Sequence, residues 1–288
     1  MKSLKPIITI LFLFIIPISL SSQKRPGKAT KVGPQNGSLV IVGGGRVDDA
    51  IFEKFIELAG GPEAQIVVVP TAAGMYAYDE NAANAGRLRS LGAKNVSVLH
   101  TTDREIANSD SFVSPLLGAK AVWFGGGRQW RLVDAYKGTR TEAMFQSVLD
   151  RGGVIGGSSA GATIQGSYLA RGDTKNNQIM MGDHEEGFGY LKNVAIDQHV
   201  LARNRQFDMF GILKEKPELL GISIDEGTAV IVQGDQFEVM GSSYVLIYDG
   251  SFWSREGWDL KELPENNKLF YFLRQGDEYD LKKRKVIE

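Results

Sequence analysis

The sequence predicts an α/β fold in which a mainly parallel sheet is covered by helices on both faces. Short, continuously apolar runs recur along the chain and alternate with stretches whose apolar residues return at helical spacing. Such runs are typical of strands buried on both faces, because the crossover helices of a parallel sheet cover both of its sides. Three of these runs end in glycines or Gly-Ser, at the strand ends where ligands of such sheets bind.

The first half of the chain alternates strands and helices. Apolar residues at 51, 52, 55, 56 and 58 illustrate the helical spacing, and the run Ile66-Val67-Val68-Val69 illustrates a buried strand. In chain order we predict a strand at 38–42, a helix at 48–58, a strand at 65–70, a helix at 81–91, a strand at 96–99, helical stretches between 104 and 117, a strand at 121–124, and helices at 130–136 and 141–149.

The second half begins with the apolar run at 154–155, which predicts another strand, followed by small residues and a short helix. A polar stretch at 171–187 comes next. We then predict a strand at 194–196, a helix at 201–213 and strands at 220–224, 229–232 and 237–240, the last two forming a hairpin across Gly234-Asp235. The tail from residue 251 is charged and weakly periodic. Since no repeat or linker follows residue 37, we predict a single domain at 37–288.

The composition excludes several kinds of site. The chain has 288 residues, 43% hydrophobic and 23% charged, as in an ordinary soluble enzyme. Its formal net charge of −1 provides no basic field for nucleic acid or an anionic membrane. Without cysteine there is no disulfide, thiolate metal site or cysteine nucleophile, and three histidines make a multi-histidine zinc site unexpected. We expect no metal and no organic cofactor.

The N-terminus has the pattern of a signal peptide. Lys2 and Lys5 precede an apolar run at 7–20, and small residues at 19–22 offer a cleavage site. The apolar run is short for a membrane span, and no cysteine follows that could carry a lipid. We therefore predict a signal peptide at 1–22, a flexible polar leader at 23–36, and export to the periplasm or the extracellular space without a stable membrane anchor; an uncleaved anchor is the alternative.

A candidate nucleophile lies in the segment Gly157-Ser158-Ser159-Ala160-Gly161, which matches the G-x-S-x-G pattern. In a nucleophile elbow the serine occupies a strained turn between a strand and a helix, and the flanking glycines leave room for that turn. By this spacing Ser159 is the nucleophile and Ser158 is the variable position. A glycine-rich loop that binds phosphate, or that simply turns, is the alternative interpretation.

A serine nucleophile needs a histidine base and an acid that orients it. His199 is our first choice over His100 and His184, because it follows a predicted strand at the end where catalytic groups gather. Two adjacent carboxylates, Asp225 and Glu226, follow another strand, and either could be the acid. An α/β-hydrolase does not fit, because its histidine comes last and late, whereas here 89 residues follow the last histidine.

The glycine run Gly43-Gly44-Gly45 invites a second interpretation, a dinucleotide-binding loop. That fingerprint requires a third glycine at position 48, where the chain has Asp48. A carboxylate there would repel a pyrophosphate, so we do not predict a nucleotide site.

Four ordered motifs resemble the cyanophycinase/dipeptidase E family of serine peptidases. They are Gly157–Ala162, Phe124–Gln129, Asp197-Gln198-His199 followed by Arg203 and Arg205, and Ile224–Ala229, and the likeness runs from about Gly37 to the C-terminus. The resemblance implies a three-layer α/β/α sandwich with a mainly parallel sheet, similar to class I glutamine amidotransferases (flavodoxin-like). It also implies a catalytic triad of Ser159, His199 and Glu226.

The same resemblance implies a substrate pocket. In cyanophycinases the residues that match Gln129, Asp197, Gln198, Arg203 and Arg205 line it. Arg203 and Arg205 suit carboxylates, which a guanidinium binds with two parallel hydrogen bonds. Because they lie two positions apart at the start of a predicted helix, they would not share one helical face.

One position departs from the family pattern. Cyanophycinases have a further arginine where this chain has Asp208. We expect Asp197 or Asp208 to receive a substrate guanidinium, or Asp208 to pair with Arg205.

The leading hypothesis is an exported serine exopeptidase that hydrolyses β-aspartyl-arginine linkages, in cyanophycin or its β-Asp-Arg fragments, through an acyl-enzyme. The N–H groups of Ala160 and of Gly125 or Gly126 would form its oxyanion hole. The alternatives are a dipeptidase E-like aspartyl dipeptidase, a non-catalytic exported binding protein of the same fold, and amide hydrolysis or transfer on free amino acids. A homodimer is left open.

Overall fold

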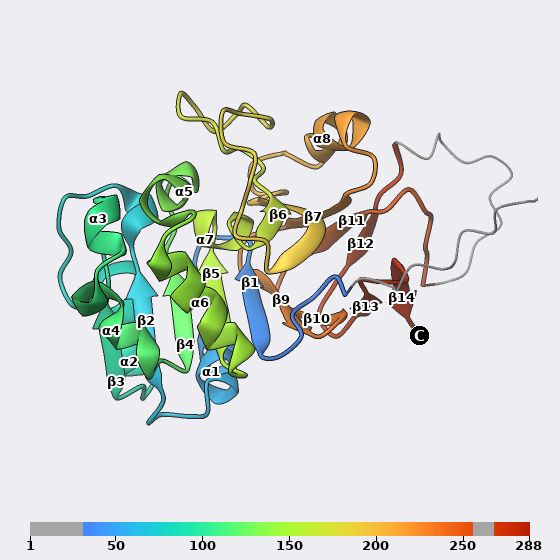
Figure 1. The fold of residues 1–288 in the computed structure, drawn as a ribbon. Helices are drawn as coiled ribbons and strands as arrows, with labels where there is room; N and C mark the ends of the chain where they lie inside the picture. The colour runs from blue at the N-terminus through green and yellow to red at the C-terminus, as the bar shows by residue number, and fades with distance from the viewer. Residues whose placement is uncertain (1–30, 256–267) are drawn as a thin grey trace, which may run out of the picture. The chain divides into compact units, whose positions relative to one another are not determined.

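The computed structural model describes residues 31–255 and 268–288, and within these residues the strands form two sheets. The centre of the larger sheet is parallel, as predicted (Figure 1). Its parallel strands, in spatial order, are β1 (Ser38–Val42), β5 (Val154–Ser158), β4 (Ala121–Phe124), β2 (Gln65–Val69) and β3 (Asn95–Val98).

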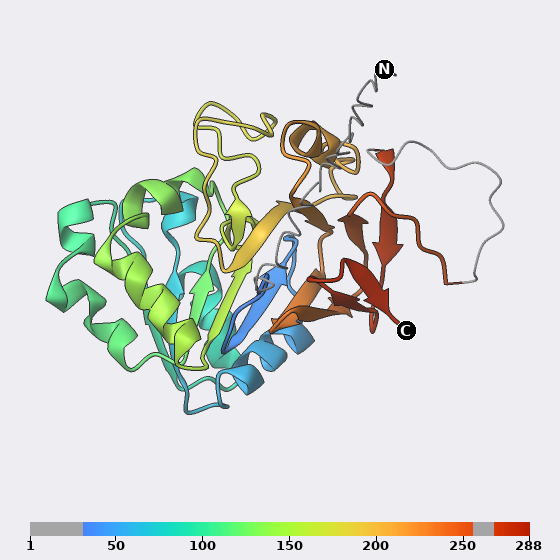
Figure 2. The same cartoon turned by 45° about the vertical axis from the view of Figure 1, so that its right-hand side comes forward.

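Side chains alternate between the two faces of this sheet, as the strand period requires. Val40 and Val42 pack toward helices α1 (Asp49–Leu58) and α2 (Ala85–Ser90). Leu39 and Ile41 belong to the other cluster, which includes α4 (Asp110–Leu117), α5 (Trp130–Tyr136) and α6 (Arg140–Asp150). Figures 1 and 2 show α6 on one side of the strands and α1 on the other. The predicted α/β/α layering is confirmed.

The larger sheet continues beyond β1 as an antiparallel extension. β9 (Thr228–Gln233) pairs with β1, and β10 (Gln236–Gly241) pairs with β9 across the turn at Gly234-Asp235, which confirms the predicted hairpin. Two strands from the charged tail, β13 (Glu278–Asp280) and β14 (Lys285–Ile287), complete the edge. These two strands were not predicted, because each has three residues and little apolar character.

A second sheet was not foreseen from the sequence. It contains the predicted strand at 194–196, which is longer than expected and begins at Leu191, together with the predicted strand at 220–224. In spatial order its strands are β12 (Tyr271–Leu273), β11 (Val245–Tyr248), β8 (Leu220–Ile224), β7 (Leu191–Gln198) and β6 (Gly166–Tyr168), of which β6, β7 and β8 run parallel. Apolar side chains on one face join the cluster that also contains α4 to α6, and those on the other face, such as Ala195 and Leu246, pack with Met209 and Ile212 in a separate cluster.

Two predicted helices are broken or shorter than expected, whereas the helical stretches predicted between 104 and 117 are present. The segment 81–91 is a 3₁₀ turn η2 (Ala82–Asn84) followed by α2, and 104–117 is divided into α3 (Arg104–Ala107) and α4, whose first turn the Ser109 side chain caps. The helix predicted at 201–213 is wrong in its first half: residues 201–208 form turns and α8 spans Met209–Glu215. The other short helices are η1 (Thr71–Ala73) and α7 (Ala160–Thr163).

The predicted signal peptide at 1–22 lies outside the described residues. Of the predicted leader, residues 31–36 are described and lie against the domain. The N–H groups of Val32 and Gly33 donate to Asp235 Oδ1 at 2.8 and 3.0 Å, and the Asn36 amide donates to the Asp150 carbonyl. Within the described ranges, no helix has both the length and the apolar character needed to cross a lipid bilayer.

Candidate active site

Ser159 occupies the turn that the G-x-S-x-G spacing predicts. It follows β5 directly, precedes α7, and has φ 58° and ψ −112°, a left-handed conformation that is strained for a residue with a side chain. The two flanking glycines leave no room for larger residues: a Cβ on Gly157 would lie 2.3 Å from the Gly161 carbonyl oxygen, and a Cβ on Gly161 would lie 2.1 Å from that of Phe124. Ser158, in contrast, is a buried strand residue.

His199 and Glu226 lie in line with Ser159. The Ser159 Oγ is 2.9 Å from His199 Nε2, and His199 Nδ1 is 2.5 Å from Glu226 Oε1. This is the geometry in which a serine can lose its proton to a histidine whose other nitrogen a carboxylate orients. The imidazole is 6% exposed, whereas the Glu226 side chain is 38% exposed, so the acid reaches toward solvent.

The glycine run after β1 holds these three segments together. Three successive carbonyls, those of Val42, Gly43 and Gly44, accept N–H groups from Ser159, His199 and Gly227 at 3.0, 2.9 and 3.2 Å. A Cβ on Gly44 would lie 2.2 Å from the imidazole ring, and a Cβ on Gly45 would lie 2.4 Å from Glu226 Oε2. The run makes room for the histidine and the acid, a role that sequence reasoning missed.

Asp225, the other candidate acid, has a different role. Its Oδ1 accepts the N–H groups of Leu201 and Ala202 at 3.0 and 2.9 Å, and its Oδ2 accepts the Ser243 hydroxyl at 2.6 Å. These bonds fix the turn at residues 201 and 202, and Asn204, with φ 54°, interrupts the predicted helix two residues later. The structure places Glu226, and not Asp225, against the histidine.

The predicted oxyanion-hole donors fall into two groups. Gly126 lies beside the nucleophile, since a Cβ on it would be 3.5 Å from Ser159 Cβ, and the N–H groups of Gly126 and Ala160 donate no hydrogen bond within the described part of the chain. Gly125 is different: its N–H donates to the Val69 carbonyl at 3.0 Å, as part of the sheet. The prediction for Gly125 is therefore wrong.

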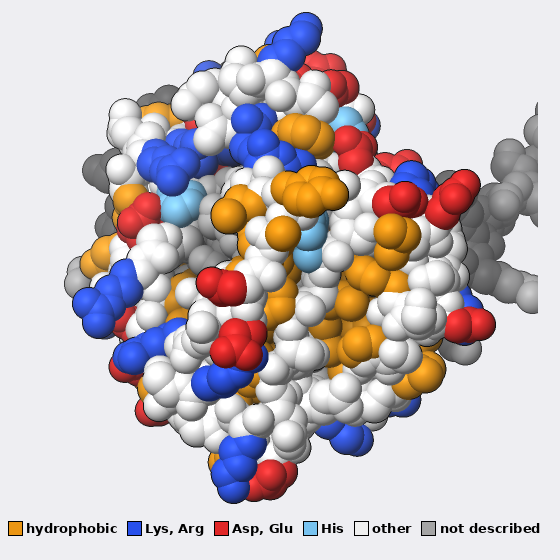
Figure 3. Space-filling view, turned by 90° about the vertical axis from the view of Figure 1, so that its left-hand side faces the viewer, with side chains coloured by type: hydrophobic (Ala, Val, Ile, Leu, Met, Phe, Trp, Pro, Cys, Tyr) orange, Lys and Arg blue, Asp and Glu red, His pale blue; other side chains and the backbone are white. Residues whose placement is uncertain are grey.

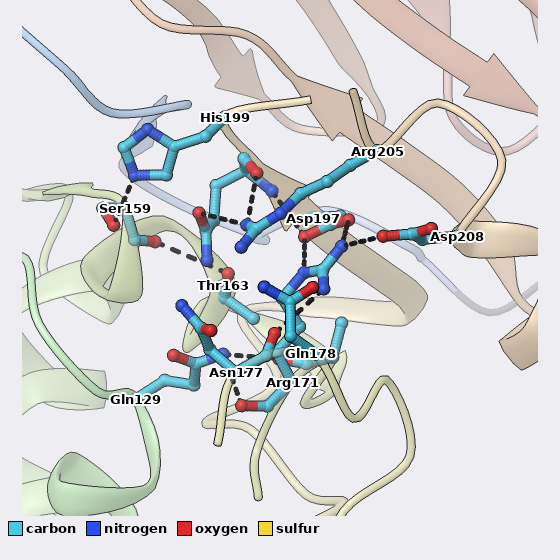
Figure 4. A network of polar contacts seen from close by, with 12 residues as sticks. Gln129, Ser159, Thr163, Arg171, Asn177, Gln178, Asp197, His199, Arg205 and Asp208 are labelled. Atoms are coloured by element: carbon cyan, nitrogen blue, oxygen red, sulfur yellow. Dashed lines mark hydrogen bonds and ion pairs between the residues drawn. The ribbon is translucent and has the colours of Figure 1, made fainter. Parts of the chain in front are cut away.

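The two predicted pocket arginines differ in their surroundings. Arg203 is exposed, whereas Arg205 is 3% exposed and its Nη1 donates to the carbonyl and the side-chain oxygen of Gln198 at 3.1 and 3.3 Å. Arg205 forms no ion pair with any described carboxylate. Burial, and then the neighbouring Arg171, lower its pKa. In Figure 4 its side chain extends toward Ser159 and His199.

Asp197 and Gln129 are also buried, but both are bound to the chain itself. Asp197 is paired with Arg171, and the Gln129 amide nitrogen donates to the carbonyls of Ala170 and Arg171 at 2.6 and 3.0 Å. Asp208 pairs with Arg171 as well, and not with Arg205 as we expected. The prediction that Asp197 contacts the substrate directly is wrong, because no part of its side chain is exposed.

The other two histidines make no contact with the nucleophile. His100 Nδ1 lies 2.9 Å from the Thr71 hydroxyl, and its ring packs edge-on against Tyr78. His184 lies between Asp134 on α5 and Asp183 at 2.8 and 3.1 Å. Choosing His199 as the base therefore agrees with the geometry.

The surroundings of His199 lower its pKa. Burial is the largest cause; the hydrogen bond that His199 donates to Glu226 acts in the opposite direction, and the positive charges of Arg203 and Arg205 lower the pKa further. The imidazole is thereby neutral, and able to accept a proton, at a lower pH than an ordinary histidine. On the face shown in Figure 3, basic and acidic side chains both lie near the visible histidine side chains.

Comparisons with known proteins show which family the chain belongs to. The model of peptidase family S51 matches residues 39–240. A cyanophycinase from Geminocystis herdmanii is 31% identical over 263 residues, which cover 85% of this chain and 94% of that protein, and a cyanophycinase from a Nostoc species is 28% identical over 286 residues, covering 93% and 91%. A solved peptidase from an acI-B1 actinobacterium has a TM-score of 0.60 and 25% identity, covering 85% of this chain and 97% of its own. The chain belongs to peptidase family S51 and is a serine peptidase.

Proposed function

We propose that this protein is a serine-type exopeptidase that hydrolyses β-aspartyl-arginine linkages, in cyanophycin or in β-Asp-Arg fragments, with Ser159, His199 and Glu226 as its triad. The observation that carries the proposal is the hydrogen-bonded line from Ser159 Oγ through His199 to Glu226. The cyanophycinase relatives support the choice of substrate.

In the proposed mechanism, Ser159 Oγ attacks the amide carbonyl while His199 Nε2 accepts its proton. The carbonyl oxygen becomes an oxyanion beside the free N–H groups of Ala160 and Gly126, each of which contributes about 3 kcal/mol. His199 then protonates the leaving amine, which gives an acyl-enzyme on Ser159. Water, deprotonated by the same histidine, releases the acid, and Glu226 stabilises the charged imidazole throughout.

Arg205 is the residue best placed to recognise the substrate. A guanidinium that is buried without a carboxylate partner has lost most of its solvation, which an anionic ligand can restore. A β-linked aspartyl residue keeps a free α-carboxylate next to the scissile amide, and this is the group we assign to Arg205. Arg203, exposed at the rim, adds attraction at longer range.

We also propose that the protein is exported, on the pattern of residues 1–22. The enzyme would then act on peptide released from cells or taken up into the periplasm. Finding the full-length N-terminus on protein isolated from the cytoplasmic fraction would refute export.

The decisive experiment separates three substrates. Purified protein lacking residues 1–22 is incubated with cyanophycin, with β-Asp-Arg and with α-Asp-Arg, and the products are identified by mass spectrometry. We expect hydrolysis of at least one β-linked substrate and none of α-Asp-Arg. If a fluorophosphonate labels Ser159 but only the α-linked dipeptide is cleaved, the dipeptidase E-like alternative is favoured. If the probe does not label the protein, the non-catalytic alternative is favoured.

A first prediction concerns the dependence of the rate on pH. Hydrolysis requires neutral His199, so kcat/KM falls as the pH drops through the pKa of this histidine, and because that pKa is lowered the fall comes at lower pH than for an ordinary histidine. Arg203→Gln removes one of the charges that lower the pKa, so the acid limb should move to higher pH. The measurement is kcat/KM against pH for both proteins.

Lys54→Gln is the matched control, because Lys54 lies on α1 and pairs with Glu57. It removes one positive charge without changing the surroundings of His199, so its acid limb should coincide with that of the wild type. An equal shift in both variants would mean that net charge, and not the proximity of Arg203, sets the pKa.

A second prediction concerns the arginine pocket. Arg205→Lys should lower kcat/KM for β-Asp-Arg by roughly 10- to 100-fold, mainly through KM, because lysine keeps the charge but not the planar fork that binds a carboxylate. Arg203→Lys is the control and should change kcat/KM by less than about threefold, as expected for an exposed charge. Equal losses in the two variants would argue against Arg205 as the carboxylate-binding residue.

A further inference from the structure

Arg171 is a fully buried arginine in the polar stretch between β6 and β7. Its Nε and Nη2 donate to the two oxygens of Asp197 at 2.8 and 2.9 Å, and its Nη2 also lies 2.6 Å from Asp208 Oδ2. Its Nη1 donates to the Asn177 carbonyl at 2.9 Å. Figure 4 shows its guanidinium lying against both carboxylates. Every nitrogen of this guanidinium is bound by the chain.

Asp197 is fully engaged by these bonds. Its Oδ1 accepts the N–H of Gln198 at 2.8 Å in addition to Arg171 Nε, and the side chain is 0% exposed. Asp208 has one oxygen on Arg171, and 37% of its side chain is exposed. The pair of carboxylates that could have received a substrate guanidinium therefore already holds one, supplied by the protein.

Arg171 also joins the segments that build the pocket. Gln129 binds its carbonyl, Asp197 and Gln198 lead directly into His199, and Asp208 precedes α8. Arg171 itself has φ 58°, a strained conformation that persists only where its surroundings fix it. Burial is the largest single influence and lowers the pKa of Arg171, but the hydrogen bonds and negative charges of Asp197 and Asp208 together outweigh it, so the pKa is raised and the residue stays charged.

We propose that Arg171 is a specificity-determining positioning residue whose guanidinium fills the carboxylate site that an arginine side chain of the substrate would otherwise enter. The inference rests on the proposed function. It follows that the enzyme recognises the β-aspartyl unit and its α-carboxylate, and accepts β-aspartyl peptides whose leaving residue is not arginine. The substrate class is then β-aspartyl dipeptides and peptide ends in general, with β-Asp-Arg as one member.

The first test compares two dipeptides on the wild-type enzyme. β-Asp-citrulline has the shape of β-Asp-Arg but carries a neutral urea group in place of the guanidinium. We expect the two kcat/KM values to differ by less than about tenfold, whereas a carboxylate reserved for the substrate guanidinium would favour arginine by roughly 10- to 100-fold or more. A preference for β-Asp-Arg of the larger size overturns the proposal.

The second test asks whether free guanidinium ion can replace the Arg171 side chain between Asp197 and Asp208. In Arg171→Ala, low millimolar guanidinium chloride should bind between Asp197 and Asp208, raise the Tm and restore part of the lost kcat, while sodium chloride at the same concentration should do neither. Arg151→Ala is the matched control. Arg151 donates to the carbonyls of Leu116 and Ala119 and not to carboxylates, so guanidinium should not stabilise that variant.

These measurements test the proposed function and the role of Arg171 separately. If the wild type cleaves neither dipeptide, the proposed function fails, but the rise in Tm of Arg171→Ala still decides whether a guanidinium site exists. A folded Arg171→Ala that guanidinium neither stabilises nor reactivates overturns the assignment of Arg171. If that variant does not fold at all, the comparison of arginine and citrulline on the wild type decides.

Discussion

Replacing Ser159 by alanine should lower kcat for β-Asp-Arg by on the order of 10⁴-fold or more while leaving the fold intact. In the proposed mechanism this hydroxyl forms the acyl-enzyme, and in Ser-His-acid triads the remaining donors support only a small residual rate. Its removal takes away the partner of His199 Nε2, but Nδ1 keeps its bond to Glu226, which still holds the imidazole in place. The measurement is kcat together with the thermal unfolding curve.

Ser158→Ala is the matched control for this experiment. Ser158 is a strand residue whose Cα lies opposite Val42 in β1, so its side chain is not on the strained turn. We expect a loss of less than about tenfold in kcat, equivalent to less than 1.4 kcal/mol in the barrier. If both folded variants were equally inactive, Ser159 would not be identified as the nucleophile.

The second large effect is expected at the acid of the triad. Glu226→Gln should lower kcat by roughly 10³- to 10⁴-fold, because the amide can hold the wrong tautomer of His199 and cannot stabilise the charged imidazole. Since 38% of the Glu226 side chain is exposed, the free energy of unfolding should change little. The measurement is kcat in parallel with the urea midpoint of unfolding.

Asp225→Asn should give the opposite combination of effects. The carboxylate accepts three hydrogen bonds, from the N–H groups of Leu201 and Ala202 and from Ser243, and an amide replaces one acceptor oxygen by a donor. We expect a loss of about 1–3 kcal/mol in the free energy of unfolding and a smaller loss of kcat than in Glu226→Gln. A larger loss of kcat in Asp225→Asn would place the triad acid at Asp225.

The elements and residues that sequence reasoning found have local causes. Ser159 follows from a five-residue spacing, and His199 follows from its place after a buried strand. The parallel strands were visible because each is a continuous apolar run that helices cover on both faces. The choice of Glu226 over Asp225 came from the family resemblance and not from the spacing.

What was missed depends on contacts between distant segments. Asp197 is closed to substrate because Arg171, in a stretch that is merely polar in the sequence, binds it across 26 positions. The helix expected from residue 201 is replaced by turns, in which Asn204 has φ 54° and Asp225 binds the N–H groups of Leu201 and Ala202 from a distant segment. Gly125 and Gly126 are adjacent glycines that the sequence alone does not distinguish. Of the two, only Gly125 donates its N–H to a β2 carbonyl, that of Val69.

The three successive carbonyls at the end of β1 have a consequence for how the enzyme loses activity. Each segment of the triad is bonded to this one strand, and β1 is itself paired with β5 on one side and β9 on the other. Local opening of any one of these segments therefore has to break its hydrogen bond to a carbonyl at the end of β1, a strand whose apolar side chains are fully buried. Inactivation by heat should then be as cooperative as global unfolding, and a partly opened molecule with a free, reactive serine should not accumulate.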